Sequence, residues 1–179
     1  KNGIGAVTLT GLSTYTGGTT ITQGSLIGTT STIQGNVTTN GALVFDQVAS
    51  GTYNGVIDGS GSVTKTGTGT VTLSGINTYS GGTTISQGTL SGTTASLQGN
   101  IVDNGTIDFN QSTTGTFSGS ISGSGNLTKS GSGTLILANA QTYTGGTTLN
   151  SGTLEGTTTS LQSDITNNGT VSFNQGFVG

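Results

Sequence analysis

The chain repeats itself every 64 residues, and this period restricts its fold more than any other feature. Segment 14–21 returns at 78–85 and 142–149, each time with one Tyr and a Gly-Gly pair that is followed by two Thr. The three Lys of the chain, at 1, 65 and 129, keep the same step. A disordered chain has no reason to hold residues in such register. We therefore predict one ordered repeat segment over 1–179, with repeats 1–64, 65–128 and a truncated 129–179.

Composition excludes several classes of function. Gly, Thr and Ser make up just over half of the chain, charged residues are 5%, and His, Cys and Arg are absent. A Ser-His or Cys-His pair is therefore impossible, and no basic surface for nucleic acid is expected. No apolar run approaches the roughly 18 residues of a membrane helix, so we expect no direct membrane span. The first residue is Lys, so we expect a segment or a processed product.

Inside each repeat the apolar residues alternate with polar ones, as in 71–73 and 107–109. A period of two, many β-branched residues and Gly-rich breaks are typical of short β-strands. A sandwich of hairpins is one alternative, but the regular repetition favours an all-β solenoid, in which each coil buries its face against its neighbours. With three strands per coil, we predict about three coils of roughly 21 residues in each repeat.

The recurring apolar residues are expected to point inward and to stack in ladders. The predicted core ladder comprises Phe45, Phe109, Phe173, Leu73, Ile85, Leu90, Ile107 and Leu127. The repeated motif at 14–21 is interpreted as a turn. Its Tyr residues are predicted to stack as a structural ladder with hydroxyls bonded to the backbone, rather than as an exposed row that binds sugars. The predicted turn residues are Tyr15, Tyr79, Tyr143, Gly17, Gly18, Gly81, Gly82, Gly145 and Gly146.

The stretch 59–85, GSGSVTKTGTGTVTLSGINTYSGGTTI, resembles the passenger-associated transport repeat of bacterial autotransporters, also called the autotransporter-associated β-strand repeat. The stretches 1–26 and 123–154 resemble it as well. The resemblance implies a right-handed parallel β-helix on the bacterial cell surface or in the extracellular space. It also implies export through an outer-membrane pore with folding outside, where the repeats are structural and assist secretion.

Catalysis and metal binding receive weak support. Asp103 and Asp108 are close enough in sequence to face one groove, as the clustered carboxylates of β-helical carbohydrate enzymes do, but no carboxylate recurs in all three repeats. We interpret the acids as solvent-facing groups that keep the surface soluble. Each Gly-Gly pair is followed by Thr-Thr, not by the Gly-x-Asp of calcium β-rolls. We predict no enzyme, no metal site and no cofactor.

Four functions remain open, and the first is preferred: a secreted structural rod that forms a stalk and aids export. The second is an extracellular filament or matrix fibre built by end-to-end stacking. The third is a carbohydrate-active enzyme, and the fourth is a surface adhesin. The expected partners are flanking coils of a longer β-helix or copies of the same chain, with surface glycans or neighbouring or host cells as further candidates and no nucleic acid.

Overall fold

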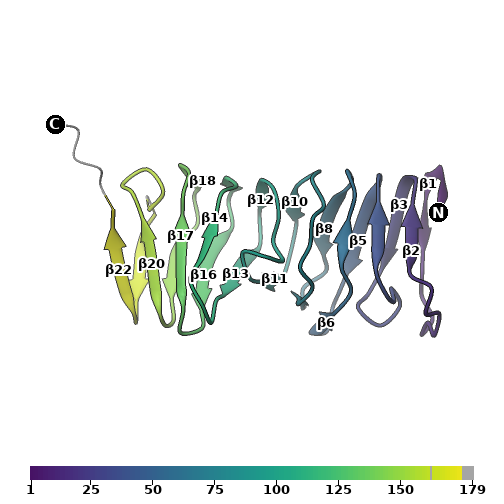
Figure 1. The fold of residues 1–179 in the computed structure, drawn as a ribbon, viewed down its shortest axis with the longest axis horizontal. Coiled ribbons are helices and arrows are strands. Elements are labelled where there is room, and N and C mark those ends of the chain that lie inside the picture. Colours follow the sequence, from purple (N-terminus) through teal and green to yellow (C-terminus); the bar gives the residue numbers. More distant parts are fainter. Residues whose placement is uncertain (162, 175–179) are drawn as a thin grey trace.

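The computed structural model describes residues 1–161 and 163–174, and these residues form one parallel β-solenoid. Figure 1 shows the strands side by side along a rod, with the N-terminus at one end and β22 at the other. Every pairing between strands is parallel. The predicted all-β solenoid is therefore confirmed. Among the described residues, none forms a helix long and apolar enough to cross a membrane.

Each coil contributes to three faces of the rod. Face 1 is an eight-stranded sheet. Its strands are β1 (Asn2–Thr8), β3 (Gln23–Gly28), β5 (Ala42–Asp46), β8 (Ser62–Thr66), β10 (Thr83–Ile85), β12 (Ile101–Asp103), β15 (Ile121–Gly123) and β18 (Thr142–Tyr143). Face 2 is a seven-stranded sheet. Its strands are β6 (Gly51–Tyr53), β9 (Thr70–Leu73), β11 (Thr89–Gly92), β13 (Thr106–Asn110), β16 (Asn126–Ser130), β19 (Thr147–Leu149) and β21 (Ile165–Asn167).

Face 3 consists of two shorter sheets joined by irregular backbone. The first contains β2 (Thr19–Ile21), β4 (Val37–Thr39) and β7 (Ile57–Asp58). The second contains β14 (Gly115–Phe117), β17 (Thr134–Leu137), β20 (Thr153–Gly156) and β22 (Thr170–Phe173). Between them, the Thr78 amide donates to the Ile57 carbonyl and the Asn77 amide to the Ala95 carbonyl. Backbone hydrogen bonds therefore link β7 to the next coil on this face, and that coil to the one after it.

The 64-residue repeat spans three coils and one further face. On face 1, Val63 pairs with Thr83 of the next coil, Thr83 pairs with Ile101 of the coil after it, and Ile101 pairs with Ile121. Three coils therefore take 58 residues (121 − 63), less than the predicted three times 21. The sequence equivalent of Val63 is Leu127, which lies on β16 of face 2. Each repeat is thus rotated by one face relative to the repeat before it.

The core runs along the axis of the rod and is built from the inward side chains of all three faces. Leu73, Ile85, Leu90, Ile107 and Leu127 are at most 1% exposed. Two tilted aromatic pairs cross this core, Phe45 with Tyr53 at 5.2 Å between ring centroids and Phe109 with Phe117 at 5.1 Å. The two pairs are 64 residues apart in sequence, and they show that the same packing recurs on rotated faces.

Candidate functional site

One tight turn in each repeat replaces a strand. The Thr29 carbonyl accepts bonds from the amides of Thr32 and Ile33, at 3.1 and 3.0 Å, so the chain makes a single helix-like turn there. The Thr32 hydroxyl accepts a 2.7 Å bond from the Thr29 amide, and Ile33 fills the core position of the missing strand. The same turn occurs at 93–97 and at 157–161. Because this turn is narrower than a strand, it leaves space beside the next coil.

That space forms the same cleft twice. The first cleft, of about 270 Å³, is lined by residues 30, 33–36 and 52–55. The second, of about 150 Å³, is lined by residues 94, 97–100 and 116–119. Each lining residue of the first cleft is 64 positions before one of the second. We call these two sites the turn clefts. The first lies beside β6 on face 2 and the second beside β14 on face 3.

The amide side chains of the turn clefts are held in fixed orientations. Asn36 Oδ1 accepts a 2.9 Å bond from the Val56 amide of the next coil, so its Nδ2 group points away from that bond. Gln34 Nε2 donates to the Ser31 carbonyl at 2.9 Å, which leaves Oε1 as an acceptor. Asn100 and Gln98 repeat this arrangement in the second cleft, with the Ser120 amide and the Ala95 carbonyl as partners.

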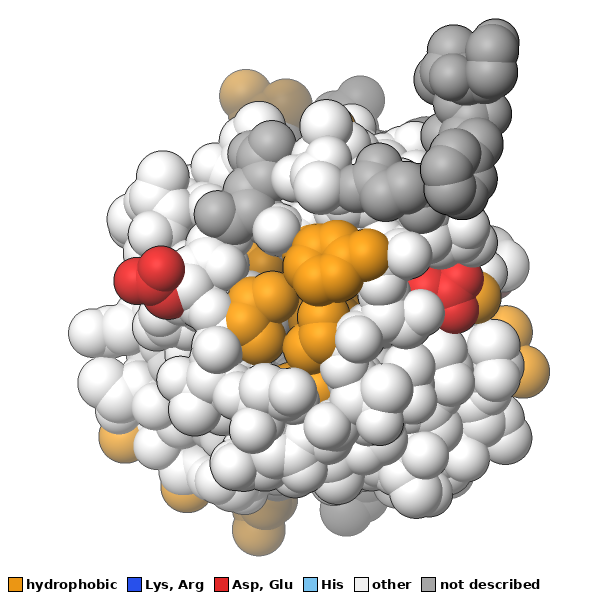
Figure 2. Space-filling view, turned by 90° about the vertical axis from the view of Figure 1, so that its left-hand side faces the viewer, with side chains coloured by type: hydrophobic (Ala, Val, Ile, Leu, Met, Phe, Trp, Pro, Cys, Tyr) orange, Lys and Arg blue, Asp and Glu red, His pale blue; other side chains and the backbone are white. Residues whose placement is uncertain are grey.

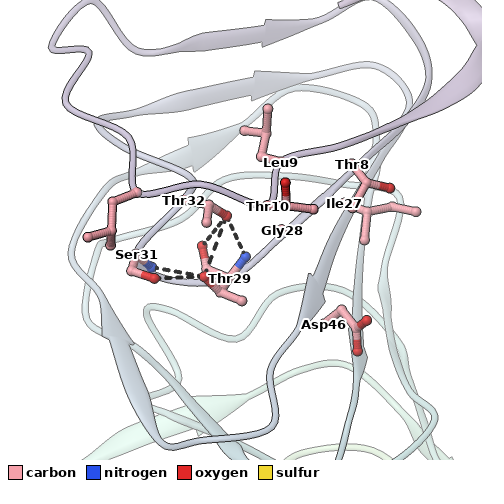
Figure 3. A pocket seen from close by; sticks show the side chains of 10 residues that line it. Thr8, Leu9, Thr10, Ile27, Gly28, Thr29, Ser31, Thr32 and Asp46 are labelled. Carbon is pink, nitrogen blue, oxygen red and sulfur yellow. Dashed lines mark hydrogen bonds between the residues drawn. The ribbon is translucent and has the colours of Figure 1, made fainter.

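A larger hollow of about 390 Å³ lies on the other side of the first tight turn. Figure 3 shows its lining, with Leu9 and Thr10 on one side, the hydrogen-bonded turn residues Thr29, Ser31 and Thr32 on another, and Asp46 set apart from both. The Asp46 carboxylate accepts a bond from the Thr66 hydroxyl at 3.1 Å. The hollow has a single carboxylate, so it lacks the paired acids of a glycosidase.

Two lysines are buried in the core, which sequence reasoning missed. Lys65 and Lys129 are 0% exposed. Lys65 Nζ donates to the carbonyls of Thr66 and Gly67, both at 2.6 Å, and more weakly to those of Gln47 and Gln87 on the adjacent coils. Burial lowers the pKa of Lys65, while the negative charge of Asp46 raises it in part. The ammonium thus ties neighbouring coils together through their backbone carbonyls.

The Lys129 ammonium makes the equivalent bonds to Ser130, Gly131 and Ser151 carbonyls at 2.6, 2.8 and 3.4 Å. Burial lowers the pKa of Lys129 as well, and Asp108 partly offsets this effect. A sequence signal for these lysines exists. Lys65 follows Val63 by two residues and thus shares its inward phase, and the Lys recurs with the repeat.

The interpretation of all acids as solvent-facing groups is wrong for Asp103. This residue is 0% exposed because it holds an inward position on β12, whereas Asp108 points outward on β13 and accepts a 2.7 Å bond from Ser91. The two carboxylates therefore do not share a groove. Among the described residues, no group of three His, Cys, Asp or Glu side chains is placed to hold a metal ion.

The remaining predicted residues are distributed around the rod. Tyr143 lies on β18 of face 1, whereas Tyr79 lies beside β7 on face 3, so the three Tyr do not form one row. Each Tyr hydroxyl bonds the Thr four residues later, and those of Tyr15 and Tyr79 also accept a backbone amide. Phe45 and Phe109 are 0% exposed, while Phe173, on the last described strand, is 56% exposed.

The Gly-Gly pairs precede β2, β10 and β19. Gly18 and Gly82 have φ angles of +72° and +80°, and a Cβ on either would lie within 3 Å of a carbonyl oxygen of the next coil. A Cβ on Gly81 or Gly145 would lie closer still to a carbonyl oxygen, at 2.6 Å from Gly61 and 2.1 Å from Gly125 respectively. Within the described part of the chain, no atom lies within 4 Å of a Cβ placed on Gly17, and a Cβ on Gly146 would lie at an ordinary 3.5 Å from the Asp164 carbonyl oxygen.

Comparison with known proteins agrees with this arrangement. The passenger-associated-transport-repeat family matches residues 1–27, 63–91 and 127–155. Together these three segments make up just under half of the chain, and each is similar to a passenger-associated transport repeat. The second and third matches begin 64 residues apart, on β8 and β16, which contain Lys65 and Lys129. The first match begins at Lys1, directly before β1.

A relative of known description is the adhesin BmaC autotransporter of Brucella suis biovar 1 (strain 1330). It is 58% identical over 64 residues, which is 36% of this chain and 2% of that adhesin. The chain therefore matches a very small part of that protein, and the matched length equals one repeat. No solved structure matches the chain. The repeats and this relative indicate an autotransporter-passenger-like β-solenoid of a surface-exposed or secreted protein.

Proposed function

We propose that the chain is part of the passenger of an autotransporter-like surface protein, where it serves as a stiff spacer without enzymatic activity. The observation that carries this proposal is the position of the three matched repeats within one continuous stack of hydrogen-bonded coils. Parallel strands bond each coil to the next, and the core continues through every coil. Bending such a rod would break several backbone hydrogen bonds at once, so it resists bending.

Folding outside the cell is the second part of the proposal. A finished coil presents a row of backbone groups and an apolar core end on which the next coil can form. Successive coils would therefore fold in order as the chain emerges, and each folded coil would prevent backward movement. The low charge and the absence of Cys are compatible with passage through a pore in extended form.

The two ends of the rod expose apolar side chains that a partner could cover. Figure 2 views the end that carries β22 and shows apolar side chains in its centre, surrounded by other side chains and backbone, with a patch of acidic side chains on each side. Phe173 is 56% exposed there, and at the other end Ile4 and Leu12 are 90% and 86% exposed. We propose that further coils of the same solenoid cover both ends. End-to-end stacking of separate copies, which would build a filament, is the second candidate.

Secretion of passengers with different numbers of repeats tests the proposal. In-frame removal of one or two repeats should shorten the surface rods in electron micrographs and reduce the amount of passenger exported. Rods of unchanged length, or full export without any repeat, would contradict the spacer and export roles respectively. Long filaments formed by the purified passenger would instead support stacking of copies.

A further inference from the structure

We propose that the two turn clefts are binding sites for neutral, hydroxyl-rich sugar units of glycans. This inference adds a ligand class to the surface role proposed above, and it rests on that role only for access to such glycans. The strongest observation is recurrence, since the same nine sequence positions enclose a hollow in two successive repeats. The hollow is therefore encoded by the repeat and is not peculiar to one coil.

The clefts offer an ordered donor and an ordered acceptor. Because Asn36 Oδ1 is engaged by the Val56 amide, the Nδ2 group is left to donate, and because Gln34 Nε2 is engaged, Oε1 is left to accept. In residues 1–161 and 163–174, no protein group bonds to either free atom. Neighbouring hydroxyls of a sugar can accept from one amide and donate to the other, which is how amide side chains recognise such groups.

The lining argues against charged or apolar ligands. Neither turn cleft contains a Lys, Asp or Glu. The apolar lining residues are closed off, with Ile33 and Tyr53 at 1% and 2% exposure and Leu97 and Phe117 at 1% and 3%. A peptide ligand needs a pocket for an apolar anchor, and none is open here. Thr52, Thr116, Asn54 and Ser118 add exposed polar groups at the rim.

The size and position of the clefts define how they would bind. Their volumes lie below the ~300–1,000 Å³ of drug-sized sites, so each cleft accommodates about one sugar unit and binds weakly. The second cleft is displaced along the rod by three coils and one face, about 16 Å at 4.8 Å per coil. It opens on a different face. A long passenger would present clefts all around the rod and hold a glycan network by many weak contacts.

Titration of the full chain with maltohexaose, followed by NMR of the side-chain amide groups, tests the proposal. We expect the Nδ2 signals of Asn36 and Asn100 to shift with dissociation constants near ~1 mM. The double variant Asn36→Asp/Asn100→Asp keeps the Oδ1 acceptor and removes the donor, so it should weaken binding about threefold to tenfold. Asp164 occupies the equivalent position in the third repeat, which shows that the solenoid accepts Asp there.

Asn40→Asp/Asn104→Asp is the matched control. Asn40 and Asn104 also accept a backbone amide of the next coil, from Ser60 and Ser124, but lie outside the turn clefts. This variant has the same added charge and should bind as the unmodified chain does. Equal losses in both variants, or no shift with maltohexaose at millimolar concentration, would overturn the proposal. So would shifts with an uncharged glycine–serine pentapeptide but not with the sugar.

The outcome is independent of the spacer role. Amide shifts are measured on the purified chain, whereas export and rod length are measured on cells. A chain that exports normally but ignores sugars refutes only the turn-cleft assignment, and a chain that binds sugars but does not affect export refutes only the export role.

Discussion

Lys65 and Lys129 hold equivalent places in successive repeats, yet Lys65 lies on face 1 and Lys129 on face 2 of the solenoid. Lys65 pairs with Phe45 of the preceding coil, and Lys129 pairs with Phe109 in the same way. The same pairing of Lys with Phe thus recurs in successive repeats, but on the next face of the rod. Three repeats return to the starting face, so any surface feature of a repeat is presented around the whole rod.

Deletion of residues 65–128 should yield a folded, shorter rod. The new junction joins Thr64 to Lys129, which can take the place of Lys65 above Phe45, so the contacts at the junction resemble native ones. We expect cooperative unfolding and a rod shorter by about 16 Å, measured by circular dichroism and small-angle scattering.

Deletion of residues 65–96 is the matched control for this experiment. It removes half a repeat, and the strands after the junction would then meet neighbours with which they have no native register. This variant should unfold at a clearly lower temperature or aggregate. If both deletions behave alike, the 64-residue period is not what determines the packing of the coils.

Acylation should distinguish the buried lysines from the exposed amines. Lys65 and Lys129 are 0% exposed and hold their ammonium groups among backbone carbonyls, whereas the amino terminus of Lys1 is exposed. Treatment of the folded chain with an amine-reactive ester, followed by peptide mass spectrometry, should label Lys1 and leave Lys65 and Lys129 unmodified. All three should react in denaturant. Rapid labelling of Lys65 in the folded chain would contradict its burial among the backbone carbonyls.

Replacement of Lys65 by Met should destabilise the solenoid. Met has a similar length but no donor, so the carbonyls of Thr66 and Gly67 lose charged partners. Hydrogen bonds to charged groups contribute about 1.5–3 kcal/mol each, and the removed burial cost of the charge offsets part of the loss, so we expect a net loss of about 1–3 kcal/mol. Urea unfolding measures it. Lys1→Met, at an end of the described solenoid, should cost much less.

The fold was predictable from the sequence because the relevant signals are local and repeated. Alternation at 71–73 and 107–109 marks strands, and the 64-residue period indicates stacked coils. The rotation between repeats was missed because it depends on coil length. The tight turn at 29–33 replaces a strand, so three coils need fewer residues than strand counting suggests. The turn clefts result from this turn and were missed for the same reason.

The burial of charged side chains was the second feature that was not predicted from the sequence. The alternation of inward and outward residues places Lys65 and Asp103 in inward positions. Their burial was nevertheless not predicted, because charged residues are rarely buried. These charged side chains can be buried because each stacked coil brings backbone carbonyls and amides close to the core, where they form hydrogen bonds with them. Asp103 Oδ1 uses one such group, the Gly105 amide at 2.9 Å.

Substitution of Gly92 by Ala should disrupt the tight turn that follows it. A Cβ at Gly92 would lie 2.3 Å from Ser96 Oγ and 3.0 Å from Leu97 Cγ, both of which are buried. Overpacking of this kind costs about 1–3 kcal/mol, measurable by urea unfolding. Gly11→Ala is the control, because no atom lies within 4 Å of a Cβ there. A neutral Gly92→Ala would mean that the turn has room to move.

Asp103 should make the solenoid more stable at mildly acidic pH. Burial raises its pKa from 3.8 to about 6, although the Gly105 and Ile107 amides act in the opposite direction. The folded state therefore binds this proton more tightly than the unfolded state does. Its contribution is fully present below about pH 4 and is lost as pH rises through about 6. The difference is on the order of 3 kcal/mol.

The first repeat supplies the matched variant for this test. Thr39 lies between Ile21 and Gly59 just as Asp103 lies between Ile85 and Gly123, and its hydroxyl donates to the Gly41 carbonyl at 3.1 Å. Asp103→Thr should therefore fold, gain stability at pH 7 and lose the part of the pH dependence that arises between pH 4 and 6. Urea unfolding at pH 4, 5, 6 and 7 measures this, with Asp164→Asn as the control for a carboxyl outside the core. Parallel pH profiles for the unmodified chain and Asp103→Thr would contradict this prediction, because they would show that the pKa of Asp103 is the same in the folded and unfolded states.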